Sequence, residues 1–160
     1  MRASIKSGLI ALMLTGAAVL HSMNLPQQTT GSNARSEAEL VKLLDRFADA
    51  WNRHDLDALM SMMTDDCVFE ASTGRRANGQ RSEGAQAVRA AYAAVFETFH
   101  DAHWANPRHF VAGDRGVSEW TFTGTHNDGT WVEVTGCDLF TFRDGKIAIK
   151  NSYRKNRPTI

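Results

Sequence analysis

The chain has 160 residues, a length that suits one domain, and its apolar share of 42% is enough to fill a core. Eighteen basic residues balance 18 acidic ones, so no excess of positive charge indicates binding to nucleic acid. The two cysteines, Cys67 and Cys137, are too few for a disulfide framework or a closed zinc site. We interpret both as free thiols in a core.

The amino-terminal segment differs in kind from the rest. Arg2 and Lys6 precede an apolar run of 13 residues, Gly8–Leu20, which fits the core of a secretory signal and is short for a membrane span. Residues 1–22 are therefore predicted to be a signal-like leader, which places the mature protein in the periplasm or outside the cell. Because no good cleavage site follows, two alternatives stay open: an uncleaved anchor, or a cytoplasmic protein that starts at Met23.

Residues 23–35 are polar and predict a flexible lead-in to a folded domain at 36–156, in which no membrane span is expected. Three helices are predicted in the first half of this domain. Ser36 and Glu39 form a capping-box pattern, and the helix that follows has an apolar stripe of Leu40, Leu44, Phe47 and Trp51. A short second helix follows Asp55 and holds residues up to Met63, and the third runs from about Ala85 to His100.

Runs of β-branched and aromatic residues between turn residues predict strands. A first strand at 67–71 is followed by a polar loop at 72–83, and later strands are expected at 109–111, 117–125, 130–142 and 146–153. The Asp-Gly pairs at 128–129 and 144–145 predict hairpins. Helices followed by a strand meander indicate an α+β fold, in which the helices cover one face of a mixed or antiparallel sheet.

Asp138 is the first candidate for chemistry. Alternation along its strand places it on the same face as Val134 and Phe140, where a carboxylate is costly unless it is paired or protonated. Desolvation favours the neutral acid, which can donate a hydrogen bond to a developing oxyanion. The alternative is a structural aspartate that a lysine or a backbone amide satisfies.

Three segments together resemble a known family. The run Gly136–Ile147 is similar to the "D-x-F-x-F-x-x-G-K-I" hairpin of SnoaL-like polyketide cyclases and ketosteroid isomerases, in the nuclear transport factor 2-like superfamily. Trp51–Leu59 and Asp65–Glu70 resemble their "N-x-x-D-x-D-x-L … D-D-x-V-x-E" segment, and the resemblance spans about residues 37–155. It implies a cone-shaped, curved sheet with three helices on its concave face around a pocket. It also implies a homodimer that packs through the outer sheet face.

Ketosteroid isomerases combine an aspartate base with an oxyanion hole of a tyrosine and a protonated aspartate. The resemblance places Asp138 on the protonated aspartate. Phe47 stands where the tyrosine is expected, and Ala71 stands where the base is expected, with Glu70 one residue earlier. Since two of the three parts are absent, steroid isomerisation by that mechanism is not expected unless Glu70 points inward.

Aromatic side chains of the helix stripes and of the Asp138 face are predicted to line the pocket: Phe47, Trp51, Tyr92, Phe96 and Phe140. Trp120 and Phe122 share one face of their strand and are further candidates, although the pattern does not decide which face. Alignment with the family places Lys150 and Ser152 inside, near Asp138. Lys150 would then keep Asp138 ionised, either as the charge partner of a general base or as half of a structural ion pair, and both alternatives stay open.

His100, His103 and His109 lie close together in the sequence, and His100 and His103 have the spacing of a pair of metal ligands. No third ligand is in register with this pair, so no metal is expected. The sequence also lacks phosphate-loop and nucleophile motifs, and we expect no cofactor. The expected partner is a small hydrophobic, oxygenated molecule. Our first hypothesis is acid–base catalysis of the isomerase, cyclase or dehydratase type by Asp138 with Lys150 or Glu70. The alternatives are a non-catalytic carrier and a dimerisation module whose own side chains fill the pocket.

Overall fold

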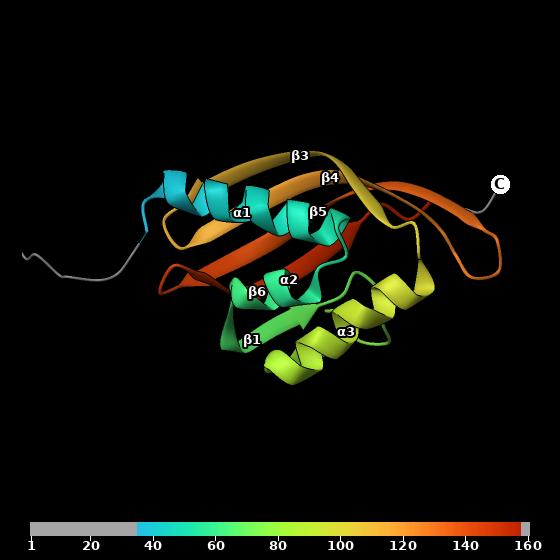
Figure 1. Ribbon diagram of the computed structural model, residues 1–160, viewed down its shortest axis with the longest axis horizontal. Helices are drawn as coiled ribbons and strands as arrows, with labels where there is room; N and C mark the ends of the chain where they lie inside the picture. The colour runs from blue at the N-terminus through green and yellow to red at the C-terminus, as the bar shows by residue number, and fades with distance from the viewer. Residues whose placement is uncertain (1–34, 158–160) are drawn as a thin grey trace, which may run out of the picture. The chain divides into compact units, whose positions relative to one another are not determined.

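The computed structural model describes residues 35–157, so the predicted leader and most of the lead-in lie outside the described residues. Its elements, labelled in Figure 1, are the helices α1 (Glu37–Asn52), α2 (Leu56–Ser61) and α3 (Ala85–Thr98) and the strands β1 (Met63–Glu70), β2 (Arg81–Glu83), β3 (His103–Ala112), β4 (Arg115–Thr125), β5 (Trp131–Arg143) and β6 (Lys146–Arg154). In this part of the chain, no helix is both long enough and apolar enough to span a membrane.

The strands form one curved, open sheet in the order β2-β1-β6-β5-β4-β3. Only β1 and β6 pair in parallel, while every other neighbouring pair is antiparallel. The parallel pair is possible because α3 and the β3–β5 meander separate the two strands in the chain. The α+β fold with three helices predicted from the sequence is confirmed.

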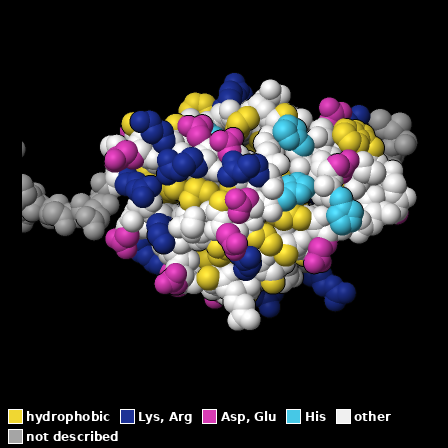
Figure 2. Space-filling model, viewed as in Figure 1, with side chains coloured by type: hydrophobic (Ala, Val, Ile, Leu, Met, Phe, Trp, Pro, Cys, Tyr) yellow, Lys and Arg dark blue, Asp and Glu magenta, His cyan; other side chains and the backbone are white. Residues whose placement is uncertain are grey.

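Helix α1 begins where the capping box predicts. The Ser36 side chain accepts the Glu39 amide, and the Glu39 carboxylate accepts the Ser36 amide, so both ends of the box are present. The buried stripe of the helix packs against the inner face of the sheet, and the ring centroids of Phe47 and Phe140 are 6.0 Å apart. Acidic and basic side chains are interspersed over the exposed side of α1, with apolar side chains between them (Figure 2).

Several predicted boundaries were wrong. Helix α2 ends at Ser61, so Met63 belongs to β1 and not to this helix, and α3 ends at Thr98. Strand β1 begins at Met63, not at residue 67, because Met63, Cys67 and Phe69 all face the core and the Ile147 amide bonds to the Met62 carbonyl. Part of the predicted loop is β2, which pairs with the end of β1. Strand β3 starts at His103, because an irregularity between Ala105 and Arg108 accommodates Pro107, which has no amide proton to donate.

The register settles which side chains face inward. Asp138 lies opposite Ser118 on β4 and opposite Ser152 on β6, while Phe140 lies opposite Lys150. Alternation then places Trp120 and Phe122 on the same inner face as Asp138. This concave face, covered by the helices, carries the candidate site.

Candidate functional site

Asp138 is buried and accepts three hydrogen bonds. Its Oδ1 accepts from the Lys150 ammonium at 2.8 Å and from the Ser152 hydroxyl at 2.5 Å, and its Oδ2 accepts from the Trp120 indole at 2.9 Å. The Lys150 ammonium and the Trp120 indole N–H can only donate, whereas the Ser152 hydroxyl can donate or accept. An ammonium bonded to Oδ1 is the arrangement of an ion pair, which does not match the neutral acid that the oxyanion-hole interpretation requires.

Lys150 forms the other half of this ion pair. The side chains of Lys150 and Asp138 are only 7% and 8% exposed. The ammonium also donates to the Ser152 hydroxyl at 2.7 Å and lies 5.4 Å from the ring centroid of Trp51 and 5.0 Å from that of Phe69. The aromatic faces and the carboxylate together compensate a cation that has lost most of its water.

Lys150 and Ser152 line a pocket of about 490 Å³ between α3, the segment after β1 and the inner face of the sheet. Its walls carry six large aromatic side chains, Trp51, Phe69, Phe99, Trp104, Trp120 and Phe122. Arg154 and His126 add further basic groups, and the lining residues described include no aspartate or glutamate. The lining of this space therefore combines aromatic faces with basic groups.

Asp138 itself borders a different and much smaller space. A chamber of about 30 Å³ lies between α1 and the sheet, and Asp138, Ser118 and His109 are among the residues that line it. Trp51, Trp104, Trp120 and Lys150 line both the chamber and the pocket. A molecule in the pocket would meet Lys150 and Ser152 directly, whereas Asp138 lies behind them.

The aromatic residues predicted for the pocket divide into two groups. Trp51, Trp120 and Phe122 line it, whereas Phe47 and Phe140 line only the small chamber. Tyr92 is fully buried in the core and donates to the Met63 sulfur at 3.3 Å. Burial raises the pKa of Tyr92 well above its usual range, so the phenol stays protonated. Phe96 packs beside Trp51, with ring centroids 5.2 Å apart, and is not among the residues lining the pocket.

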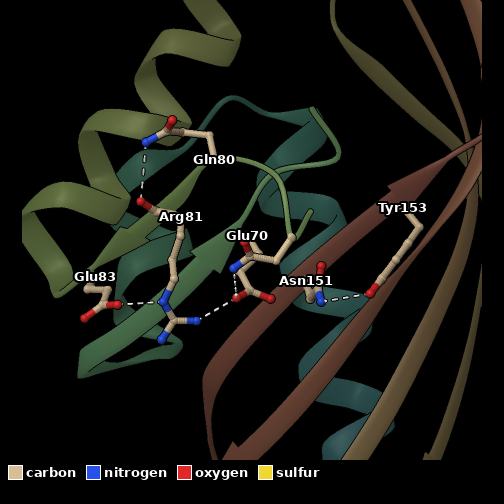
Figure 3. Close-up of polar contacts among 7 residues, drawn as sticks. Glu70, Gln80, Arg81, Glu83, Asn151 and Tyr153 are labelled. Atoms are coloured by element: carbon tan, nitrogen blue, oxygen red, sulfur yellow. Dashed lines mark hydrogen bonds and ion pairs between the residues drawn. The ribbon is translucent and has the colours of Figure 1, made fainter. Parts of the chain in front are cut away.

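Glu70 lies on the outer face of the sheet, because Phe69 takes the inward position on β1. Its carboxylate accepts from Arg81 at 2.6 Å and from Asn78 at 3.0 Å, and Arg81 also binds Glu83 (Figure 3). The hydrogen bond from Asn78 and the charge of Arg81 lower the pKa of Glu70. The structure therefore does not bring Glu70 together with Asp138, and its contacts anchor the segment between β1 and β2.

Trp104, Phe99 and Arg154 are pocket residues that the sequence analysis missed. Trp104 faces inward opposite Phe122, but the irregularity before Arg108 breaks the alternation that would have revealed it. Arg154 shares the parity of Lys150 and Ser152 on the last strand, so alternation in the sequence alone would have predicted that it faces the interior. Between residues 35 and 157, no group of three metal-ligating side chains lies close enough to hold an ion.

The family model of the SnoaL-like domain matches residues 44–149, more than half of the chain, and the protein therefore belongs to this family. This confirms the resemblance found in the hairpin and helix motifs. No curated protein matches the sequence.

Solved structures share the fold. A proposed polyketide cyclase from Xanthomonas campestris pv. campestris has a TM-score of 0.67 at 20% identity, over 78% of this chain and 93% of its own. An NTF2-like protein of unknown function from Mesorhizobium loti has a TM-score of 0.63 at 28% identity, over 75% and 93%. TerC, crystallised with polyporic acid, has a TM-score of 0.64 at 21% identity, over 73% and 92%. At such identities, the similarity to the first and third structures establishes the fold and not the activity.

Proposed function

We propose that this domain binds a small, flat, largely apolar molecule through an oxygen atom that contacts Lys150 and Ser152. The observation that carries this proposal is a buried ammonium at the wall of a pocket lined by aromatic side chains. A carbonyl, enolate or carboxylate oxygen would gain a charge-assisted hydrogen bond there. The crystallisation of TerC, a protein of the same fold, with polyporic acid is consistent with a ligand of this kind.

The same geometry supports acid–base chemistry. Ser152 donates to Asp138, so its oxygen could take a proton from a bound molecule while its own proton moves to the carboxylate. The Lys150 ammonium would stabilise the negative charge left on the molecule. An isomerase, cyclase or dehydratase reaction of a carbonyl compound needs both a proton acceptor and a group that stabilises negative charge. A non-catalytic carrier needs only the charged group that binds the ligand.

Binding can be measured by calorimetry with 2-naphthoate as the probe. We expect 2-naphthoate to bind at least about tenfold more tightly than neutral 2-naphthalenemethanol, because Lys150 favours the anion. The double variant Asp138→Asn/Lys150→Met should lose this preference, whereas Lys146→Met, at an exposed position of the same strand, should keep it. Equal affinities for the two probes in the unmodified protein would contradict the proposal.

Proton transfer can be measured separately as exchange of the α-protons of 2-tetralone in D2O, followed by NMR. The protein should accelerate exchange above the buffer rate, and Ser152→Ala should lower the acceleration by about 10²-fold or more, the contribution of one general acid–base group. Binding of 2-naphthoate without any accelerated exchange would favour the carrier.

We also propose a homodimer formed through the outer sheet face. The large exposed apolar residues in the described part of the chain are Phe110, Trp131 and Tyr153, and alternation places all three on this face. A groove of about 780 Å³ beside Tyr153 is lined by outward residues such as Thr121 and Cys137.

The oligomeric state can be measured by light scattering after size exclusion. We expect a mass twice that of one chain, and Trp131→Ser/Tyr153→Ser should shift the protein to monomer because it removes apolar contact area. Arg46→Ser, an exposed change on α1, should leave the dimer intact. A monomeric unmodified protein at about 100 µM, well above the dissociation constant of a stable dimer, would rule this interface out.

A further inference from the structure

Polar side chains cross the concave face in a single row. His109 on β3 pairs with Ser118 on β4, Ser118 pairs with Asp138 on β5, and Asp138 pairs with Ser152 on β6. Residues that face each other on neighbouring strands have Cβ atoms about 4.5–5.5 Å apart. The row therefore connects the pocket, at Ser152, to the edge of the sheet at β3.

The far end of the row reaches the surface through α1. His109 Nδ1 lies 2.7 Å from the Ser118 hydroxyl oxygen. Nε2 is buried, makes no hydrogen bond to the protein atoms described, and lies 3.4 Å from Asp45 Oδ1. The His109 side chain is 4% exposed, whereas that of Asp45 is 60% exposed. Burial lowers the pKa of His109, although the charge of Asp45 opposes this effect. At neutral pH the imidazole is therefore neutral, with one nitrogen able to donate and the other able to accept.

The small chamber joins the two halves of the row. Ser118 and Asp138 both line it, and its volume of about 30 Å³ is enough for one water molecule. Among the described residues, no direct hydrogen bond links these two side chains. Trp51 also borders the chamber, and its indole N–H is buried without a hydrogen-bond partner among the protein atoms described. A water that reaches this N–H would satisfy it.

Building on the proposed function of the pocket, we propose that His109 is a positioned proton acceptor, linked to Asp138 and Lys150 through Ser118 and one water. The site would then exchange protons with solvent beside α1, away from the ligand. Two charged groups of opposite sign, Asp138 and Lys150, lie across the chamber from His109. A third charged group, Asp45, faces His109 from α1.

The proton path balances without a co-reactant. Ser152 takes a proton from the bound molecule and gives its own to Asp138, which passes one to the water. The water gives a proton to Ser118, and Ser118 gives one to His109 Nδ1. Each intermediate group receives one proton and releases one. The bound molecule keeps a negative charge beside Lys150, and His109 becomes an imidazolium beside Asp45.

The link can be tested in the free protein by following the NMR titration of His109. Lys150→Met should raise the pKa of His109 by about half a unit or more, because the uncompensated Asp138 carboxylate then stabilises the imidazolium. Asp138→Asn should lower it, because only the Lys150 cation remains. Arg154→Met removes the same charge from the pocket wall but lies outside the row, and should change the pKa by less than about 0.2 units.

Ser118→Ala distinguishes coupling through the hydrogen-bonded row from direct electrostatic coupling across the interior. In a protein that carries Ser118→Ala, the changes in the His109 pKa caused by Lys150→Met and Asp138→Asn should be less than half of those measured with Ser118 present. Equal shifts of the His109 pKa with and without Ser118, or shifts no larger than that of Arg154→Met, would overturn the inference. Either of the two charge variants suffices for this test if the other does not fold.

The titration of His109 is done without any ligand, so failure of 2-naphthoate to bind would contradict only the proposed function. Loss of the coupling with intact binding would affect only the role of His109.

Discussion

Asp138→Ala is expected to lower the free energy of unfolding by about 3–5 kcal/mol, because it leaves the Lys150 ammonium buried without a counter-ion. Three donors also lose their acceptor, since Lys150, Ser152 and Trp120 all bond to this carboxylate. Denaturation in urea, followed by circular dichroism, measures the change as a shift in the midpoint. Asp65→Ala, at an exposed position on β1, is the matched control and should have little effect.

The double variant Asp138→Leu/Lys150→Met distinguishes an unpaired charge from lost packing. Replacing both partners of a buried ion pair by apolar residues of similar size is often neutral or stabilising. We therefore expect the double variant to recover most of the stability that Asp138→Ala loses, while it no longer discriminates 2-naphthoate from its neutral analogue. If the double variant were as unstable as Asp138→Ala, the ion pair would not be the cause.

Gly136→Ala should cost about 1–3 kcal/mol, the range for overpacking a filled site. A methyl group at this position would overlap the Tyr153 carbonyl oxygen on β6 and the six-membered ring of Trp120 on β4. The backbone oxygen cannot move without breaking strand pairing, so Trp120 is expected to shift and to lose its hydrogen bond to Asp138. The loss is measurable as a changed chemical shift of the Trp120 indole proton.

Gly124→Ala is the matched control for this change. It lies on β4, on the same inner face of the sheet as Gly136 on β5. The nearest atoms to a methyl group there belong to the Phe99 and Phe122 side chains, at 3.1 Å, and these can move slightly. We expect less than half of the destabilisation seen at Gly136. Similar costs for the two variants would mean that the close approach of Trp120 to Gly136 has no special role.

The sequence predicted the elements whose signals are local. The capping box at Ser36, the start of the second helix after Asp55 and the hairpin pair Asp144-Gly145 all appear where expected, because each depends only on neighbouring residues. The Asp55 side chain accepts from the Ala58 amide and so caps this helix. Strand β2 was missed because its three residues gain their structure from pairing with β1. The start of β3 was missed for a related reason, since an irregular strand has no clean alternation to detect.

The prediction of the site residues also depended on whether a position is determined by neighbouring residues or by contacts between distant segments. Alternation along one strand was enough to predict that Asp138 faces the core. The family alignment predicted the inward position of Lys150, which local pattern alone left open. The division of the interior into a chamber and a pocket could not be predicted, because it depends on how Trp51, Trp104 and Trp120 pack across elements that are distant in sequence.

An open sheet has two borders at which a foreign strand could add. Here one border is β2, which has only three residues, and the other is β3, where Pro107 and the irregularity beside it interrupt the row of free amide groups. Neither border offers a long, flat template for uncontrolled fibril growth. The proline that breaks the alternation at the start of β3 thus also makes this edge a poor template for the addition of a foreign strand.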